Sequence, residues 1–181
     1  MKWGLINLKK VTILSALLFL LLSSTAYGKY YNMGYSLDVI GYNAYGTNGI
    51  YYTTNAAKYW NDAANTRIGP GPQSKNSIAA LDYNDEWLGL YMPQPILPGS
   101  VTQFSICINE RTLKIYQKES HPGKDYRHLA INTTVHELGH ALFLDDLGSV
   151  GNISIMSNNR DRFNHVPRTQ DVKEIKANRG Y

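Results

Sequence analysis

The chain has 181 residues with one cysteine, and its 18 lysines and arginines outnumber its 14 aspartates and glutamates, for a formal net charge of +4. The first 28 residues hold three lysines and no acid, so residues 29–181 carry 15 basic against 14 acidic side chains, a net charge of +1. This balance gives no electrostatic case for a nucleic-acid partner, and one cysteine excludes an internal disulfide. The 153 residues from 29 to 181 suit one domain.

Residues 1–28 have the pattern of an export signal peptide. Three lysines precede an apolar run at 11–22, and small residues stand at Ala26 and Gly28. The run of 12 residues is shorter than the roughly 20 needed to span a bilayer. We therefore expect a secreted, extracellular, monomeric protein comprising residues 29–181, with no stable membrane insertion after cleavage. The alternative is an uncleaved N-terminal anchor.

The sequence predicts a strand followed by a helix in the first part of the expected domain. Apolar and polar residues alternate over 35–40, and glycines and asparagines over 41–49 indicate a loop. A helix with a cap at Thr54 or Asn55 is predicted next, because apolar residues follow at helical spacing. Those residues are Ala56, Tyr59, Trp60, Ala63 and Ala64, of which Trp60 is expected in the core.

Three further strands are predicted after a glycine- and proline-rich break at 69–72. They cover 78–83, 87–92 and 104–109, and the last contains Cys107 as an expected core residue. The remaining predicted segments are a loop at 121–125, a long helix after it, and a final helix from Thr169 to Lys176.

The long helix contains the pattern on which the function prediction depends, His136-Glu137-Leu138-Gly139-His140. Positions i and i+4 lie on one face of a helix, so His136 and His140 can direct a ring nitrogen at one point. Glu137 then lies beside that point. In this HExxH arrangement two imidazoles hold zinc and the glutamate acts on the metal-bound water.

Two imidazoles require a third protein ligand, and Asp146 lies ten residues after His136. This spacing resembles the long metal-binding motif of the metzincin metallopeptidases, in the snapalysin-like variant whose third ligand is aspartate. Ser154-Ile155-Met156-Ser157 resembles the Met-turn of that clan. The chain is therefore similar to small bacterial matrixin-like and snapalysin-like metzincins.

The resemblance implies an α+β zincin fold. Its expected parts are a twisted, mixed, five-stranded sheet, a substrate-binding edge strand at 87–92, an active-site helix, the Met-turn and a C-terminal helix. It also implies a secreted zinc endopeptidase that cleaves a protein or peptide substrate, with Zn²⁺ on His136, His140 and Asp146 and Glu137 as general base. The alternative is a zinc-binding, metzincin-like binding module at the cell surface with weak or no catalysis.

One residue departs from the family pattern. Phe143 stands where the family has a glycine that turns the chain toward the third ligand. Either the turn stores strain or it is made differently, and Asp145 is the competing ligand to Asp146. Of the other histidines, His121 and His165 are expected in solvated loops and His128 in a structural role.

Overall fold

The computed structural model describes residues 31, 34–35, 39–96, 98, 101–149 and 151–179. The expected export signal at 1–28 lies outside these residues, and secretion therefore stays a prediction. Within the described ranges, no helix combines the length and the apolar character that a membrane crossing needs.

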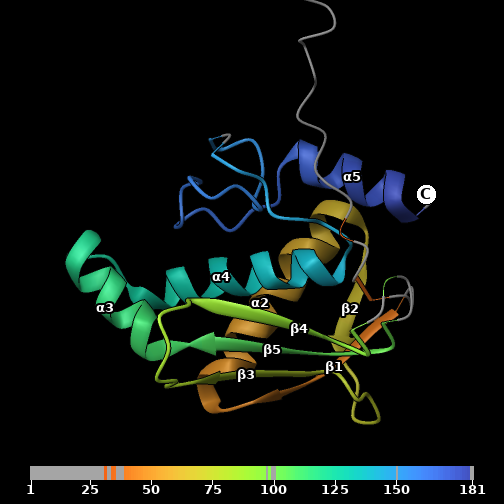
Figure 1. Ribbon diagram of the computed structural model, residues 1–181, viewed down its shortest axis with the longest axis horizontal. Coiled ribbons are helices and arrows are strands. Elements are labelled where there is room, and N and C mark those ends of the chain that lie inside the picture. Colours follow the sequence, from red (N-terminus) through yellow and green to blue (C-terminus); the bar gives the residue numbers. More distant parts are fainter. Residues whose placement is uncertain are drawn as a thin grey trace, which may run out of the picture.

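Five strands form one mixed sheet in the order β2-β1-β3-β5-β4 (Figure 1). Its parallel part runs through β2 (Arg67–Pro70), β1 (Val39–Tyr45), β3 (Ser77–Leu81) and β5 (Gln103–Asn109). Buried and partly exposed residues alternate along β3 and β5, because successive side chains of a strand point to opposite faces. One face of the sheet is therefore the core face.

Strand β4 (Gly89–Gln94) forms one edge of the sheet and is antiparallel to β5. Gly89 pairs with Ile108, and Gln94 pairs with Gln103. The predictions of an α+β fold, a five-stranded mixed sheet and an edge strand near 87–92 are thus confirmed.

Four helices accompany the sheet in the described part of the chain. α2 (Thr47–Ala64) and α4 (Tyr126–Ala141) lie against the same sheet face, α3 (Glu110–Ser120) follows β5, and α5 (Thr169–Arg179) lies beyond α4 (Figure 1). The fully buried large side chains between these layers are Tyr52, Trp60, Phe104, Ile40, Ile78, Ile106, Ile108, Leu113, Leu129, Leu138, Leu142 and Leu144.

Trp60 is completely buried, as expected, and it also joins two helices. Its indole Nε1 donates a hydrogen bond of 2.8 Å to the carbonyl of Val135 in α4. A buried indole N–H needs such a partner, so α2 is fixed against the helix that carries the histidine pair.

Two sequence-based boundaries were wrong because tertiary contacts outweigh local preference. Residues 39–45 form β1 although a loop was expected from 41, and α2 begins at Thr47, well before the predicted cap. Gly49 lets the helix approach the sheet, since a Cβ there would lie 3.2 Å from the backbone nitrogen of Ala80. The Asn48 amide donates to Glu110 at 2.6 Å, which holds the first turn.

Two elements were not predicted at all. β2 contains Gly69 and Pro70, which indicated a break, yet an edge strand tolerates proline because one side of it needs no donor. α3 is mostly exposed, with only Glu110 and Leu113 buried, so it lacks a strong apolar stripe. Its cap is nevertheless visible in the sequence, since the Asn109 side chain accepts from the Thr112 N–H.

Candidate metal centre

Helix α4 carries the histidine pair and is buried over most of its length. Asp125 caps its start by accepting from the Arg127 N–H, and every residue from Leu129 to Ala141 is buried. A helix buried all round normally lacks polar groups, so the buried His136, Glu137 and His140 mark a site.

The chain reverses sharply after α4, and the turn is made at Phe143 in the left-handed region, with φ +69°. The Leu144 N–H donates to the Gly139 carbonyl at 3.0 Å, which closes the turn. This conformation costs a bulky residue on the order of 1 to 2 kcal/mol. Of the two alternatives considered for Phe143, the strained turn is the one observed, and it directs the following residues back over the helix.

Three side chains converge where the turn returns. Ligand atoms of His136, His140 and Asp146 all lie within 4.8 Å of one another. Asp146 Oδ1 lies 3.1 Å from His136 Nε2 and 3.9 Å from His140 Nε2. Two ligand atoms at zinc bond length and the tetrahedral angle would be ~3.3 Å apart, so these separations suit a tetrahedral metal ion.

The second nitrogen of each imidazole is held by the backbone. His136 Nδ1 lies 3.1 Å from the Ile155 carbonyl, and His140 Nδ1 lies 2.8 Å from the Leu144 carbonyl. A carbonyl oxygen only accepts, so each Nδ1 carries the proton and each Nε2 lone pair faces Asp146. This tautomer is the one that binds a metal, and the residues therefore fit a divalent ion.

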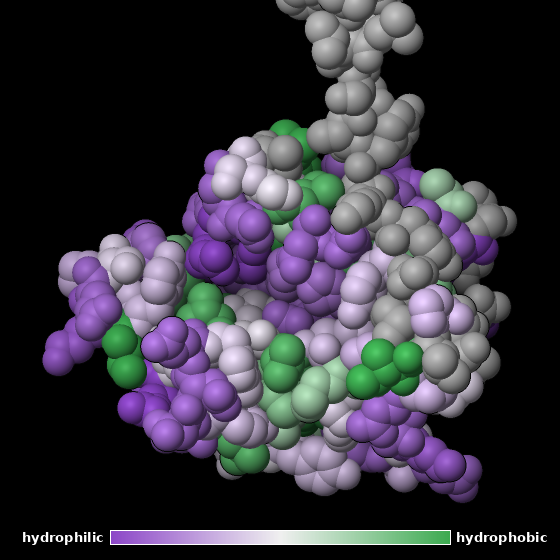
Figure 2. Space-filling view, in the orientation of Figure 1, coloured by the Kyte–Doolittle hydropathy of each residue, from purple (hydrophilic) through white to green (hydrophobic). Residues whose placement is uncertain are grey.

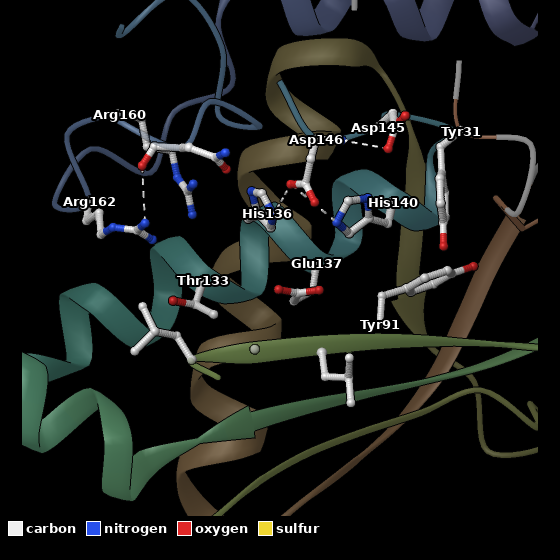
Figure 3. Close-up of a pocket in the computed structure, with 14 residues that line it drawn as sticks. Tyr31, Tyr91, Thr133, His136, Glu137, His140, Asp145, Asp146, Arg160 and Arg162 are labelled. Atoms are coloured by element: carbon white, nitrogen blue, oxygen red, sulfur yellow. Dashed lines mark hydrogen bonds and ion pairs between the residues drawn. The ribbon is translucent and has the colours of Figure 1, made fainter. Parts of the chain in front are cut away.

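Asp145 is not a member of this group. It lies on the cavity wall, and its Oδ1 accepts from the Asp146 N–H at 2.9 Å. Figure 3 shows Asp146 directed at both histidines and Asp145 on its outer side. The structure thus groups Asp146, and not Asp145, with the two histidines, and its role as the third ligand stays a prediction.

The segment expected to resemble a Met-turn lies directly beneath α4. Met156 is fully buried, and a Cβ on Gly139 would lie 2.5 Å from its sulfur, so only glycine allows this approach. The buried Asp171 of α5 holds the turn, because its carboxylate accepts from the Ser154 hydroxyl and from the Ile155 N–H. The carbonyl of Ile155 is therefore fixed where it orients His136.

Burial sets the protonation of the central groups. It lowers the pKa of His136 to about 4 and also lowers that of His140, so both rings are neutral at pH 7 in the metal-free protein. Burial, followed by the charge of Asp146, raises the pKa of Glu137 to about 8, although the Tyr91 N–H opposes this by donating to the carboxylate. The Glu137 carboxylate lies between α4 and β4, beside His136, His140 and Asp146 (Figure 3).

A cavity of about 380 Å³ opens over this group. Figure 2 shows a hollow with hydrophilic residues around it, bordered by the apolar residues of the sheet edge. Tyr31 and Tyr91 flank His140, with ring centroids 5.1 Å and 6.0 Å from its imidazole. Thr133, Arg160 and Arg162 lie at the opposite end (Figure 3).

Sequence reasoning missed the tyrosines, Arg160 and Asp171 as parts of this region. They come from segments far from the motif, and no spacing rule connects them with it. Of the other histidines, His165 is half-buried, and its inaccessible Nδ1 has no hydrogen-bond partner among the described residues, so the expectation of a solvated loop was wrong there. It packs against His128 with ring centroids 5.4 Å apart.

The sequence matches no protein-family model and no curated protein. Its fold resembles a chain of a solved structure described as the GM1 bound form of the ECX AB5 holotoxin. The TM-score is 0.57 at 15% sequence identity, over 84% of this chain and 87% of that chain. At 15% sequence identity, the comparison shows a similarity of fold alone.

This comparison corrects the predicted function. The structure that this chain resembles is described by the ligand it binds and by its assembly as a toxin, and that description names no peptidase activity. The prediction of a secreted zinc endopeptidase with Glu137 as general base is therefore replaced. The alternative drawn from the sequence, a binding module, agrees better with the comparison.

Proposed function

We propose that this protein is a zinc-binding module of metzincin-like fold that binds a ligand at the cell surface, with little or no catalysis. The observation that carries the proposal is the convergence of His136, His140 and Asp146 at the floor of a cavity. The likeness of the fold to a chain of a structure described as a GM1-bound holotoxin supports ligand binding as the function.

Zinc is the metal that this donor set suits best. Two imidazole nitrogens and one carboxylate oxygen are ligands that zinc accepts in four-coordinate sites, whereas calcium and magnesium prefer oxygen alone. When bound, zinc would supply one open coordination position for a ligand oxygen or nitrogen. His136 and His140 would be held in orientation by the carbonyls that their Nδ1 groups contact.

The metal proposal is tested by zinc analysis of the purified chain 29–181. We expect about one zinc per chain, which Asp146→Ala loses under mild chelation. Asp145→Ala is the matched control, because Asp145 has the same charge and lies next to Asp146 but outside the ligand group; it should keep the metal. Zinc loss from Asp145→Ala but not from Asp146→Ala would contradict the assignment.

The binding role is tested by adding GM1 vesicles and a peptide library to the zinc-loaded protein. We expect binding to vesicles in preference to GM1-free controls and no cleavage of the library. Glu137→Gln should retain zinc, because its carboxylate lies outside the ligand group. Peptide cleavage by the wild type that disappears in Glu137→Gln would overturn the module interpretation.

A further inference from the structure

Two arginines lie together at the end of the cavity away from Asp146. Arg160 is only 8% exposed, and Arg162 is half-buried beside it (Figure 3). Both line the same cavity as the metal-binding group. Among the residues that the structure describes, no salt bridge joins either guanidinium to a carboxylate.

Neutral oxygens hold both guanidinium groups in place. Arg160 donates through Nε to the Asn132 side chain at 3.1 Å and through Nη1 to the Ser157 carbonyl at 2.8 Å. Arg162 donates through Nη2 to the Asn158 carbonyl at 3.2 Å. A guanidinium has five N–H donors, so each retains donors for a further partner.

Burial and a neighbouring like charge both disfavour the charged form of Arg160. Burial, followed by the charge of Arg162, lowers its pKa to about 10, although the charges of Glu137, Asp146 and Asp171 oppose this shift. The neutral oxygens that Arg160 contacts do not fully offset the desolvation of a buried cation. An anion between the two arginines would lower this cost, and arginine forks bind oxyanions in bidentate geometry.

The charge of the anion follows from the rest of the cavity. Asp145 and Asp146 line the same space, so a doubly charged phosphate would be repelled more strongly than a singly charged carboxylate. A planar carboxylate also matches the guanidinium fork.

We propose that Arg160 and Arg162 form a carboxylate-binding subsite for a ligand whose other end faces His136, His140 and Asp146. This inference rests on the proposed function, because it names the chemical class of ligand that the module binds. A sugar acid and an amino acid are two sources of such a carboxylate, and the arms of the experiment distinguish them.

The test uses two matched pairs of probes in calorimetric titrations at pH 7. N-acetylneuraminic acid is compared with its methyl ester, and N-acetylleucine with its amide. In at least one pair, we expect the acid to bind at least about 10-fold more tightly than the neutral derivative. Arg162→Gln and Arg160→Lys should remove most of that preference, because hydrogen bonds to charged groups are the strong ones.

Arg127→Gln is the control for net charge, since Arg127 lies on the surface and pairs with Asp125; it should leave the preference unchanged. Equal binding of acid and neutral probe, no binding of either acid, or a preference that survives both cavity variants would overturn the inference. All titrations are run on zinc-loaded and on metal-free protein. A missing acid preference in protein with one zinc per chain contradicts the subsite alone, whereas missing zinc contradicts the proposed function alone.

Discussion

At the scale of single residues, Phe143 shows how a site geometry can persist with an unfavourable amino acid. Its φ of +69° is the conformation that a glycine adopts without cost. The Phe143 carbonyl accepts from the Tyr31 N–H and from the Asn178 side chain, so contacts from both ends of the domain hold the turn. The position of Asp146 therefore depends on packing around the turn as well as on its own sequence.

We predict that Phe143→Gly is more stable than Phe143→Ala by about 0.5 to 1 kcal/mol, because both remove the ring but only glycine relieves the backbone strain. Urea unfolding of the two metal-free variants measures this difference. Ala63→Gly in α2 is the control of opposite sign, since glycine in a helix costs about 1 kcal/mol. A Phe143→Ala variant as stable as Phe143→Gly would show that the turn is unstrained.

At the scale of elements, Asp171 joins α5 to the segment around Met156. It is fully buried, and besides Ser154 and Ile155 it accepts from the Arg168 N–H. Its position in the first turn of a helix was visible in the sequence as a favourable charge near the helix N-terminus. The structure gives it a second role, which is to fix the carbonyl that orients His136.

Asp171→Ala should destabilise the metal-free protein by about 3 to 5 kcal/mol, because one hydroxyl and two N–H groups lose their buried acceptor. Zinc affinity should also fall about 10- to 100-fold, as is typical when the support of a ligand is removed. Denaturant unfolding and competition with a chelator measure the two effects. Asp62→Ala, at an exposed residue of α2, should change neither; equal losses in both variants would contradict this role.

The elements also show why the sequence predicted the grouping of three candidate ligands better than the helix and strand boundaries. The histidine pair and Asp146 are set by local spacing on one helix and one turn, and the structure brings them together. α2 was predicted too short because its first turns depend on Glu110, a residue 62 positions from Asn48. Arg160 could not be found for the same reason, since its partner Asn132 lies 28 residues away.

At the scale of the whole molecule, buried titratable groups make stability depend on pH in two opposite directions. Burial lowers the pKa of His136 and of His165 to about 4, and it lowers that of His140 as well. Between pH 6.5 and 4 the unfolded chain binds protons at these positions that the folded chain does not. The contribution of these neutral histidines to the stability of the metal-free protein is therefore fully present above about pH 6.5 and is lost as the pH falls.

Glu137 acts in the other direction, because its pKa is raised to about 8. Between its ordinary pKa of about 4.5 and pH 8 the folded protein holds a proton that the unfolded chain has released, so stability falls as the pH rises through this window. Below pH 6.5 the effect of the three histidines on stability outweighs that of this single group, and above pH 6.5 Glu137 acts without them.

We therefore predict a stability maximum of the metal-free protein near pH 6.5. Urea unfolding from pH 4.5 to 8.5, with chelator present, should show both limbs. Glu137→Gln should abolish the decline above pH 6.5. His165→Gln should lower the slope of the unfolding free energy against pH on the acid limb by the equivalent of up to one proton. A decline above pH 6.5 that persists in Glu137→Gln would show that this carboxylate is not protonated in the folded protein.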